Sequence, residues 1–468
     1  MIRHETRDTR CKESAVSSQL STVVGHNSQL STLNSQLSIR LPLSKSVMAR
    51  ELVLDALNGR CVEIEEENDD LYVLSRALHK SQSKETRDTR HETRDIVSQY
   101  LLCETLNSQL STLNLNASGT ALRFLTAYFA VTEGEWELTG SERLCERPIK
   151  PLVDALRGMG ADIEYIDKDG FAPLKIEGRK LKGGRVRLDA SLSSQFASAL
   201  MLIADSVEGG IEIEYDGDVA SQSYISLTQN VIERYKRGVR YSGEKDWSSA
   251  TVWYAAMAVL RKGRFLFEGL SLDSYQPDRV IVEVFEKLGV RTMEVENGVE
   301  IEWCGDVVEK LVLDCRNMPD AVMYIAVAAC LLGVEFEISG VETLRVKESD
   351  RIEALINEMG KCGYEIIYNS QFTIHNLQSL KFNVQRPILS SGSNFQSNSV
   401  PRIETYNDHR VAMAMAVVGL VMDIEIENPE VVYKSYPGFW EEYKKMRNVE
   451  LGMRNYDCIY KIINKRSE

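Results

Sequence analysis

The sequence LRVKESDR, from Leu344 to Arg351, places three basic and two acidic side chains within eight residues. The stretch VEFEIS before it (334–339) alternates apolar and acidic residues as a strand does, and the apolar residues from 352 to 359 recur at helical spacing. The charges therefore lie on a strand-to-helix turn, with Ser349 as the expected N-cap and Asp350 in the first helical turn. Such a turn can bind phosphate or carboxylate. Taken alone, a solvated turn with surface ion pairs is the simpler explanation.

The rest of the chain argues for the binding site, because similar turns recur. Six times, a turn with polar residues leads directly into a helix rich in small apolar residues. The equivalent points are Lys45, Gly119, Ser193, Asp246, Asp320 and Asp408. Subtraction of these residue numbers gives 74 for three of the five intervals. Helix and strand signals between the turns predict six α/β units, which need neighbours to cover their faces.

Six units in 468 residues divide naturally into two domains of three. Helix N-termini that face the cleft between such domains would hold an anionic ligand. The predicted segments are a disordered tail at 1–35, a first domain at 44–243, a second domain at 36–43 plus 244–446, and a C-terminal tail at 447–468.

Low-complexity phrases interrupt this pattern. NSQLSTLNSQLS occurs at 27–38, and its first part, NSQLSTLN, returns at 107–114, inside an insert predicted at about 81–114. These copies are polar and lack an obvious helix or strand face, so we expect them to be mobile. The Ser- and Asn-rich stretch 388–400 predicts a surface loop. The interval before Asp246 is 21 residues short, which predicts the loss of a strand pair from one unit.

Composition limits the partners. The net charge of −14 makes nucleic acid an unsuitable partner, so an anionic substrate needs a local cluster of basic residues. No apolar run approaches 18 residues and the N-terminus lacks an apolar signal region, so we expect a cytoplasmic protein with no membrane partner. Nine scattered cysteines without a CxxC spacing indicate a reducing compartment. Six histidines form no metal-ligand pattern.

Basic and hydroxyl side chains gather on the repeated turns, and Arg and Ser are suited to phosphate and carboxylate. The motifs are LPLSKSVMAR, SGTALRFLTA, CERPIKPLVDAL, SLSSQFASALM, SQSYISLT, MPDAVM, LRVKESDR, YNDHRVAMA and YKSYPGFW. With these motifs the chain resembles the 5-enolpyruvylshikimate-3-phosphate synthase family from about Leu41 to about Tyr443. The resemblance implies the two-domain enolpyruvyl transferase fold, an inside-out α/β barrel of six βαβαββ units, three per domain, with the active site in the interdomain cleft. It also implies a monomer.

The resemblance further implies transfer of the enolpyruvyl group from phosphoenolpyruvate to the 5-hydroxyl of 3-phosphoshikimate, with release of phosphate, in the shikimate pathway of aromatic amino acid biosynthesis. The residues that match the 3-phosphoshikimate ligands are Ser46, Arg50, Ser193, Ser194, Ser221, Tyr224 and Lys347. Those that match the phosphoenolpyruvate ligands are Lys45, Gly119, Arg147, Arg351, Arg410 and Lys434. Gln195 matches a shared position. The implied reaction calls for neither a metal nor another cofactor.

Asp320 matches the proposed general base of the family, and a carboxylate at a helix start beside cations should have a lowered pKa. A capping role for Asp320 is the alternative. Either Glu348 or Lys45 fits the acid that protonates the methylene carbon, and the sequence does not choose between them.

Two other functions are alternatives. A catalytically impaired relic would keep the anion-binding cleft after the shortening at 225–245, and Leu43, where the family has a small residue, could crowd the turn before Lys45. The related UDP-N-acetylglucosamine enolpyruvyl transferase family is expected to have Asn after the cleft Lys, whereas Ser46 follows Lys45 here. That family also has no counterpart of the serine-rich SLSSQ motif.

Overall fold

The computed structural model describes residues 36–60, 69–82, 111–189, 193–217, 221–240, 243–374, 377–382 and 400–450. The predictions for the tail at 1–35, for most of the insert at 81–114 and for most of the loop at 388–400 therefore lie outside the described residues. Within the described ranges, buried apolar side chains form two separate clusters, which we call the first core and the second core.

The first core holds buried residues between Val47 and Val231. Its elements are α1 (Lys45–Leu57), α2 (Asp69–Gln82), β2 (Ser111–Asn114), α3 (Gly119–Val131), β3 (Gly134–Thr139), α4 (Glu142–Cys145), α5 (Lys150–Gly158), β4 (Asp162–Tyr165), β5 (Leu174–Gly178), β6 (Lys182–Leu188), α6 (Ser194–Ile203), η2 (Ala204–Ser206), β7 (Glu208–Tyr215) and α7 (Gln222–Lys236). Helices α1, α3 and α6 pack on one another inside this core.

The second core combines Leu37, Ile39 and Leu41 with buried residues between Trp247 and Met446. Its elements are β1 (Gln36–Ser38), α8 (Trp247–Leu260), β8 (Arg264–Glu268), η3 (Pro277–Val280), α9 (Ile281–Glu286), β9 (Leu288–Val295), β10 (Gly298–Val307), β11 (Lys310–Asp314), η4 (Pro319–Ala321), α10 (Val322–Leu332), β12 (Glu335–Ser339), η5 (Glu342–Val346), α11 (Arg351–Lys361), β13 (Ile367–Ile374), β14 (Leu377–Phe382), β15 (Arg402–Ile403), α12 (His409–Val418), β16 (Glu425–Ile426), η6 (Pro429–Lys434) and α13 (Phe439–Glu450).

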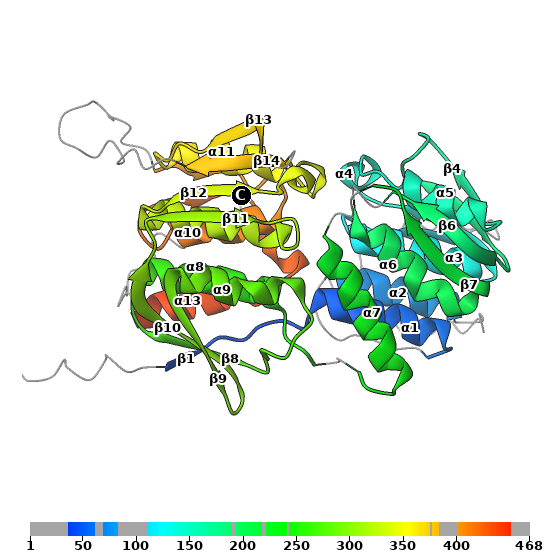
Figure 1. Ribbon diagram of the computed structural model, residues 1–468, viewed down its shortest axis with the longest axis horizontal. Coiled ribbons are helices and arrows are strands. Elements are labelled where there is room, and N and C mark those ends of the chain that lie inside the picture. Colours follow the sequence, from blue (N-terminus) through cyan, green and yellow to red (C-terminus); the bar gives the residue numbers. More distant parts are fainter. Residues whose placement is uncertain are drawn as a thin grey trace, which may run out of the picture. The chain divides into compact units, whose positions relative to one another are not determined.

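The repeated helices are buried on all sides, as their apolar composition requires. Helix α10 buries every residue from Val322 to Cys330. It contacts α8 and α12, so these three helices fill the middle of the second core (Figure 1). The polar residues at their N-termini are therefore held on rigid elements.

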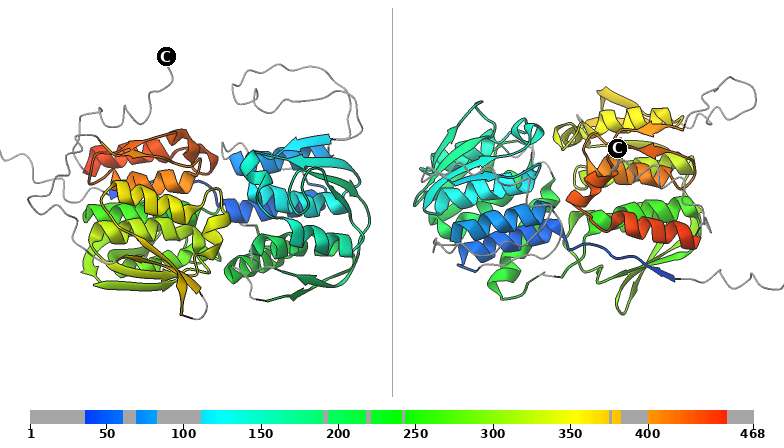
Figure 2. Two further views of the ribbon diagram at one scale, coloured as in Figure 1. Left: turned by 90° about the horizontal axis from the view of Figure 1, so that it is seen from above. Right: turned by 180° about the vertical axis from the view of Figure 1, so that it is seen from behind.

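Strand β1 reaches the second core from a distant part of the sequence. It lies parallel to β8, with Gln36 opposite Arg264, and Figure 2 shows the chain between β1 and α1 crossing from one core to the other. Leu43 pairs with Lys245 where the chain crosses back. The Leu43 side chain is half-buried against the first core, so this larger residue is accommodated by packing.

One parallel strand pair in each sheet determines where the polar turns lie. The parallel pairs are β1 with β8, β2 with β3, β6 with β7, β11 with β12, and β15 with β16. Carboxyl ends of neighbouring parallel strands meet at one edge of a sheet, which is where ligands bind in α/β proteins. Accordingly, the turn of Asp320 follows β11 and the turn of Lys347 follows β12.

The complete βαβαββ order is visible in three of the six predicted units within the described ranges. These are the units built on β2, on β11, and on β1 with β8, and each has a four-stranded sheet. The sheet β6–β7 has only two strands, and among the described residues no strand lies between α7 and α8. This agrees with the predicted loss of a strand pair before Asp246.

The structure differs from three sequence predictions in detail. The N-cap of α11 is Asp350, whose side chain accepts from the Glu353 N–H, whereas the Ser349 hydroxyl binds Asp408 instead. Parts of the low-complexity phrases form strands, because STLN is β2 and QLS is β1. Leu113 and Leu37 in these strands are buried, so one apolar residue in a polar phrase gives the strand its buried face. In addition, α13 continues to Glu450, beyond the start of the predicted C-terminal tail.

Candidate active site

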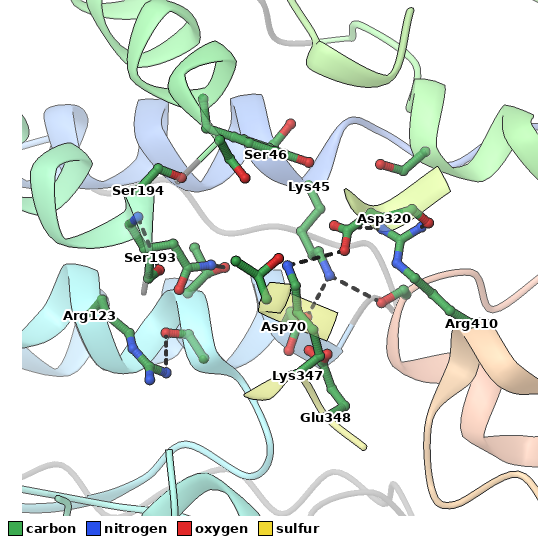
Figure 3. Close-up of a pocket in the computed structure, with 18 of the residues that line it drawn as sticks. Lys45, Ser46, Asp70, Arg123, Ser193, Ser194, Asp320, Lys347, Glu348 and Arg410 are labelled. Carbon is green, nitrogen blue, oxygen red and sulfur yellow. Dashed lines mark hydrogen bonds and ion pairs between the residues drawn. The ribbon is translucent and has the colours of Figure 1, made fainter. Parts of the chain in front are cut away.

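A single pocket brings together fifteen of the sixteen predicted site residues. They are Lys45, Ser46, Arg50, Gly119, Arg147, Ser193, Ser194, Gln195, Ser221, Tyr224, Asp320, Lys347, Glu348, Arg351 and Arg410. The sixteenth, Lys434, does not line the pocket, but its Nζ lies 3.6 Å from Glu348 Oε1. Figure 3 shows ten of the lining residues by name, and they come from both cores.

The pocket carries positive charge in an acidic chain. Seven Lys and Arg side chains and four carboxylates line it, which is an excess of three positive charges. The whole chain has a net charge of −14. The pocket is therefore built for an anionic ligand.

Lys45 begins α1 and is held by polar groups from both cores. Its Nζ donates to Asp70 Oδ2 at 2.9 Å and to Ser435 Oγ at 3.3 Å, and Figure 3 shows the contact with Asp70. Burial lowers the pKa of Lys45, but Asp70 and Glu348 together raise it, and the pKa lies above its ordinary value. Lys45 therefore carries its proton at neutral pH.

Asp246 joins the starts of two helices. Its Oδ1 accepts from the Ser249 N–H at the start of α8, and its Oδ2 accepts from the Lys45 N–H at the start of α1. Ser44, the N-cap of α1, makes no capping bond with its own side chain. One buried carboxylate thus caps a helix of each core at the pocket wall.

Arg50 is a buried cation that has only neutral partners among the hydrogen bonds of the structure. Its guanidinium donates to Thr228 Oγ1 at 2.7 Å, to the Ser46 carbonyl at 2.6 Å and to Ser198 Oγ at 3.1 Å. Burial lowers its pKa to about 10. A buried guanidinium without a carboxylate is costly, and an anion bound in the pocket would offset that cost.

The serine-rich turn at the start of α6 faces the same space. Ser193 is the N-cap and accepts from the Gln195 N–H at 3.2 Å. Gln195 donates to Thr120 Oγ1 at 3.0 Å, while its own Oε1 is buried without a partner. The hydroxyl groups and the helix N-terminus form an anion-binding surface beside Arg50.

Asp320 is surrounded by three cations. Its carboxylate lies 3.2 Å from Lys347 Nζ, 2.9 Å from Arg351 Nη1 and 3.2 Å from Arg410 Nη2. Burial raises the pKa of Asp320, but Arg410, Lys347 and Arg351 together lower it, and it lies well below the ordinary value. No capping bond of the Asp320 side chain is present at η4 or α10, so the capping alternative receives no support.

Glu348 makes a second group of ion pairs. Its carboxylate lies 2.9 Å from Arg351 Nη2, 3.6 Å from Lys434 Nζ and 3.7 Å from Arg147 Nη1. Burial raises the pKa of Glu348, but these cations lower it well below the ordinary value. Glu348 is therefore ionised at neutral pH.

Arg351 connects both carboxylates to the framework. Its Nε and Nη2 donate to Asp408, which is fully buried, at 2.8 and 3.2 Å. Asp408 also accepts from Ser349 Oγ and from the Arg410 N–H. The guanidinium of Arg351 is thus fixed in position, and Asp320 and Glu348 are fixed through it.

Several lining residues were not predicted as site residues. They include Asp70, Arg123, Thr343, His409 and Ser435. Asp70 follows an acidic run that resembles a solvated helix face, and Ser435 follows η6, so neither lies on one of the six repeated turns. Arg123 and His409 do lie on such turns, and this position in the sequence could have identified them as site residues.

His409 is buried at the pocket, and its Nδ1 has no hydrogen-bond partner. Burial, followed by Lys45, Arg410 and Lys434, lowers the pKa of His409 well below its ordinary value. Its imidazole is therefore neutral. It adds a polar group to the pocket without adding charge.

The described residues contain neither a metal-ion site nor a helix that could span a membrane. No group of three or more His, Cys, Asp or Glu side chains there is arranged to hold a metal ion. None of the helices in the described ranges combines the length and the apolar character needed to span a bilayer.

The comparisons with known proteins agree with one another. The family model of EPSP synthase (3-phosphoshikimate 1-carboxyvinyltransferase) matches residues 31–246 and 230–443. A 3-phosphoshikimate 1-carboxyvinyltransferase of Bacteroides fragilis is 34% identical over 427 residues, which cover 87% of this chain and 94% of the relative. One of Haemophilus influenzae is 34% identical over 442 residues, which cover 87% of this chain and 96% of the relative.

A solved EPSP synthase structure from Acinetobacter baumannii is similar with a TM-score of 0.57 and 20% identity, over 88% of this chain and 96% of that one. A second solved structure of EPSP synthase from the same organism gives a TM-score of 0.58 and 19% identity. At this level of identity the likeness concerns the fold alone. It confirms the predicted α/β fold class.

Proposed function

The chain belongs to the EPSP synthase family, and on that premise we propose that it transfers the 1-carboxyvinyl group of phosphoenolpyruvate to the 5-hydroxyl of 3-phosphoshikimate and releases phosphate. One observation carries the proposal. Fifteen of the sixteen residues predicted as substrate ligands or catalytic groups line one pocket with an excess of three positive charges. The two substrates together bring two phosphate groups and two carboxylates, and such a pocket can neutralise them.

The proposed subsites follow the two cores. Six of the seven residues proposed for 3-phosphoshikimate, all but Lys347, come from elements of the first core. Arg50 supports this subsite best, because it is a buried cation whose hydrogen-bond partners are neutral. The residues proposed for phosphoenolpyruvate come from both cores, and Arg147 of the first core lies 3.7 Å from Glu348 of the second. We accordingly propose that the two cores correspond to the two predicted domains.

Asp320 is the proposed general base for the 5-hydroxyl. Its lowered pKa keeps it ionised, so it can accept a proton as addition begins. For the acid, the charge states favour Lys45, which holds its proton, over Glu348, which does not. Glu348 is then proposed to orient Arg351, Arg147 and Lys434 by its ion pairs.

The test measures phosphate release by the purified full chain when both substrates are mixed. We expect turnover that needs both substrates, whereas a catalytically impaired relic would bind them without release. Asp320→Asn should lower kcat by roughly 10²- to 10⁴-fold with little change in substrate affinity. The matched control is Asp350→Asn, because Asp350 caps α11 and Asn caps equally well.

An active Asp320→Asn protein with near-normal kcat would reject Asp320 as the base. Absence of phosphate release from the unaltered chain would reject the proposed function itself. We also propose that the protein acts as a monomer in the cytoplasm. Light scattering after size-exclusion chromatography tests the first part, since a dimer would double the measured mass.

A further inference from the structure

Three side chains of the first core donate hydrogen bonds to main-chain carbonyls of the second core. Ser221 Oγ binds the carbonyl of Arg316 at 3.0 Å, and Ser223 Oγ binds that of Asn317 at 2.7 Å. Arg143 Nη2 binds the carbonyls of Arg345 at 3.3 Å and Lys347 at 3.2 Å. These bonds end at two places only, the loop before η4 and the end of η5 with the loop that follows it.

The two loops are the ones that deliver the acidic residues of the pocket. Arg316 and Asn317 lie between β11 and η4, and Asp320 follows three residues after Asn317. The other loop connects η5 to α11 and leads from Lys347 directly to Glu348. Because β11 and β12 are parallel neighbours, both loops leave the same edge of one sheet.

We propose that Ser223 and Arg143 are positioning residues, which fix the loops of Asp320 and of Lys347–Glu348 against the first core so that these groups meet the substrate held there. This inference rests on the proposed function. Neither residue lines the pocket, so each would act through the loop that it holds.

The geometry at the start of α7 favours a role in positioning over a role in capping. A Ser at an N-cap usually accepts a bond from its own helix. Ser221 makes no such capping bond, and its hydroxyl donates across to the second core instead. Its φ of 54° lies in the left-handed region, which residues other than glycine seldom occupy. The turn is therefore arranged for the contact with the Arg316–Asn317 loop.

The acceptors of the bonds from Ser223 and Arg143 are main-chain carbonyls, which also supports a role in positioning. A bond to a main-chain carbonyl fixes the path of the loop whatever side chain that residue carries. The two loops are further joined by the ion pair of Lys347 with Asp320 at 3.2 Å, so a shift of either loop moves both groups. A general base must lie within hydrogen-bond reach of its proton, and displacement by about 1 Å can cost about 100-fold in rate.

The experiment compares variants that remove each bond with matched controls. Ser223→Ala should lower kcat by about 3- to 10-fold, the scale of one neutral hydrogen bond, with both KM values changed less than about 2-fold. Ser223→Thr keeps the hydroxyl and should restore kcat. The control Ser226→Ala removes a Ser of the same helix whose Oγ bonds only within α7, to the Gln222 carbonyl.

Arg143→Ala should lower kcat and raise the KM of phosphoenolpyruvate, each by about 3- to 10-fold, because its loop carries Glu348 and its ion pairs with Arg147 and Arg351. Its control is Arg179→Ala. Both Arg side chains are 42% exposed, and Arg179 forms its ion pairs within the first core. We expect the control to keep normal kinetics.

A thermal melt accompanies each variant, and the Tm should change by less than about 2 °C because the lost contacts are peripheral to both cores. Normal kcat in Ser223→Ala and Arg143→Ala would overturn the inference. A loss of kcat that Ser223→Thr does not restore would also overturn it for Ser223. Failure of the unaltered chain to release phosphate would instead reject the proposed function, so the two outcomes are distinguishable.

Discussion

Gly119 is the residue whose replacement tests the pocket most directly. An added Cβ would lie 2.3 Å from Arg147 Nη1, 2.7 Å from Arg147 Cζ and 2.9 Å from Arg123 Nη1. Ordinary contacts of a Cβ begin near 3.4 Å, so the Arg147 guanidinium must move by about 1 Å or more in Gly119→Ala. Gly119 lies at the start of α3 and has no positive φ, so the backbone itself accepts Ala.

The size of the effect follows from what Arg147 loses. If Arg147 binds phosphoenolpyruvate, its displacement removes a hydrogen bond between charged groups, which is worth about 1.5–3 kcal/mol. That loss raises the KM of phosphoenolpyruvate by about 10- to 150-fold. Stability should not fall, because Ala is a better helix former than Gly and the backbone at this position accepts it.

The assay measures phosphate release against each substrate in turn, together with a thermal melt. The control is Gly158→Ala, at the end of α5, where an added Cβ meets no atom within 4 Å. We expect Gly119→Ala to affect phosphoenolpyruvate far more than 3-phosphoshikimate. An unchanged KM for phosphoenolpyruvate, or an equal rise for both substrates, would refute the placement of Arg147.

Two further predictions concern buried carboxylates. Burial raises the pKa of Asp70, but Lys45 and Lys434 lower it to about 2, so Asp70 contributes about 2 kcal/mol of stability above pH 4, which is lost as the pH falls towards 2. Denaturant unfolding over that range should show the difference between the unaltered chain and Asp70→Asn shrinking, and a constant difference would contradict the lowered pKa. Tyr235→Phe removes a 2.8 Å bond to the buried Asp55 and should lower the free energy of unfolding by about 1.5–3 kcal/mol, whereas the exposed Tyr275→Phe should not.

Much of the fold could be predicted because the chain repeats one pattern. Each of the six turns carries polar residues and precedes an apolar segment, and the structure has a helix after each of them. Asp246 and Asp408 are N-caps, as their position at the start of an apolar run suggests. Asp320 occupies the equivalent point, yet it is turned towards three cations instead of its own helix.

The features of the fold and the site that could not be predicted depend on contacts between distant parts of the chain. Nothing local to Asp70 indicates that it binds Lys45, which lies on another helix. Gln36–Ser38 belongs to a polar phrase, and it becomes a strand only because β8 offers it an edge. Likewise, Ser349 is the better N-cap by sequence position, but Asp408 binds its hydroxyl and leaves the cap to Asp350. Pairings of this kind carry no local sequence signal.

The arrangement of the units also explains how the chain can lose a strand pair and still keep its pocket. In the complete units, the last two strands are β4 and β5, β9 and β10, or β13 and β14, and no residue of these strands lines the pocket. The lining residues follow the parallel strands or lie in the helices. The shortened unit keeps its parallel pair β6–β7, and with it the turns of Ser193 and Ser221.

The loss of the strand pair instead reduces burial at the sheet β6–β7. Ile211 and Ile213 of β7 are half-buried, whereas Trp136 and Leu138 of the equivalent strand β3 are buried. Because burial of apolar area is the main stabilising term, the cost of the missing strands falls on the stability of the first core. It does not fall on the positions of the groups that meet the substrate.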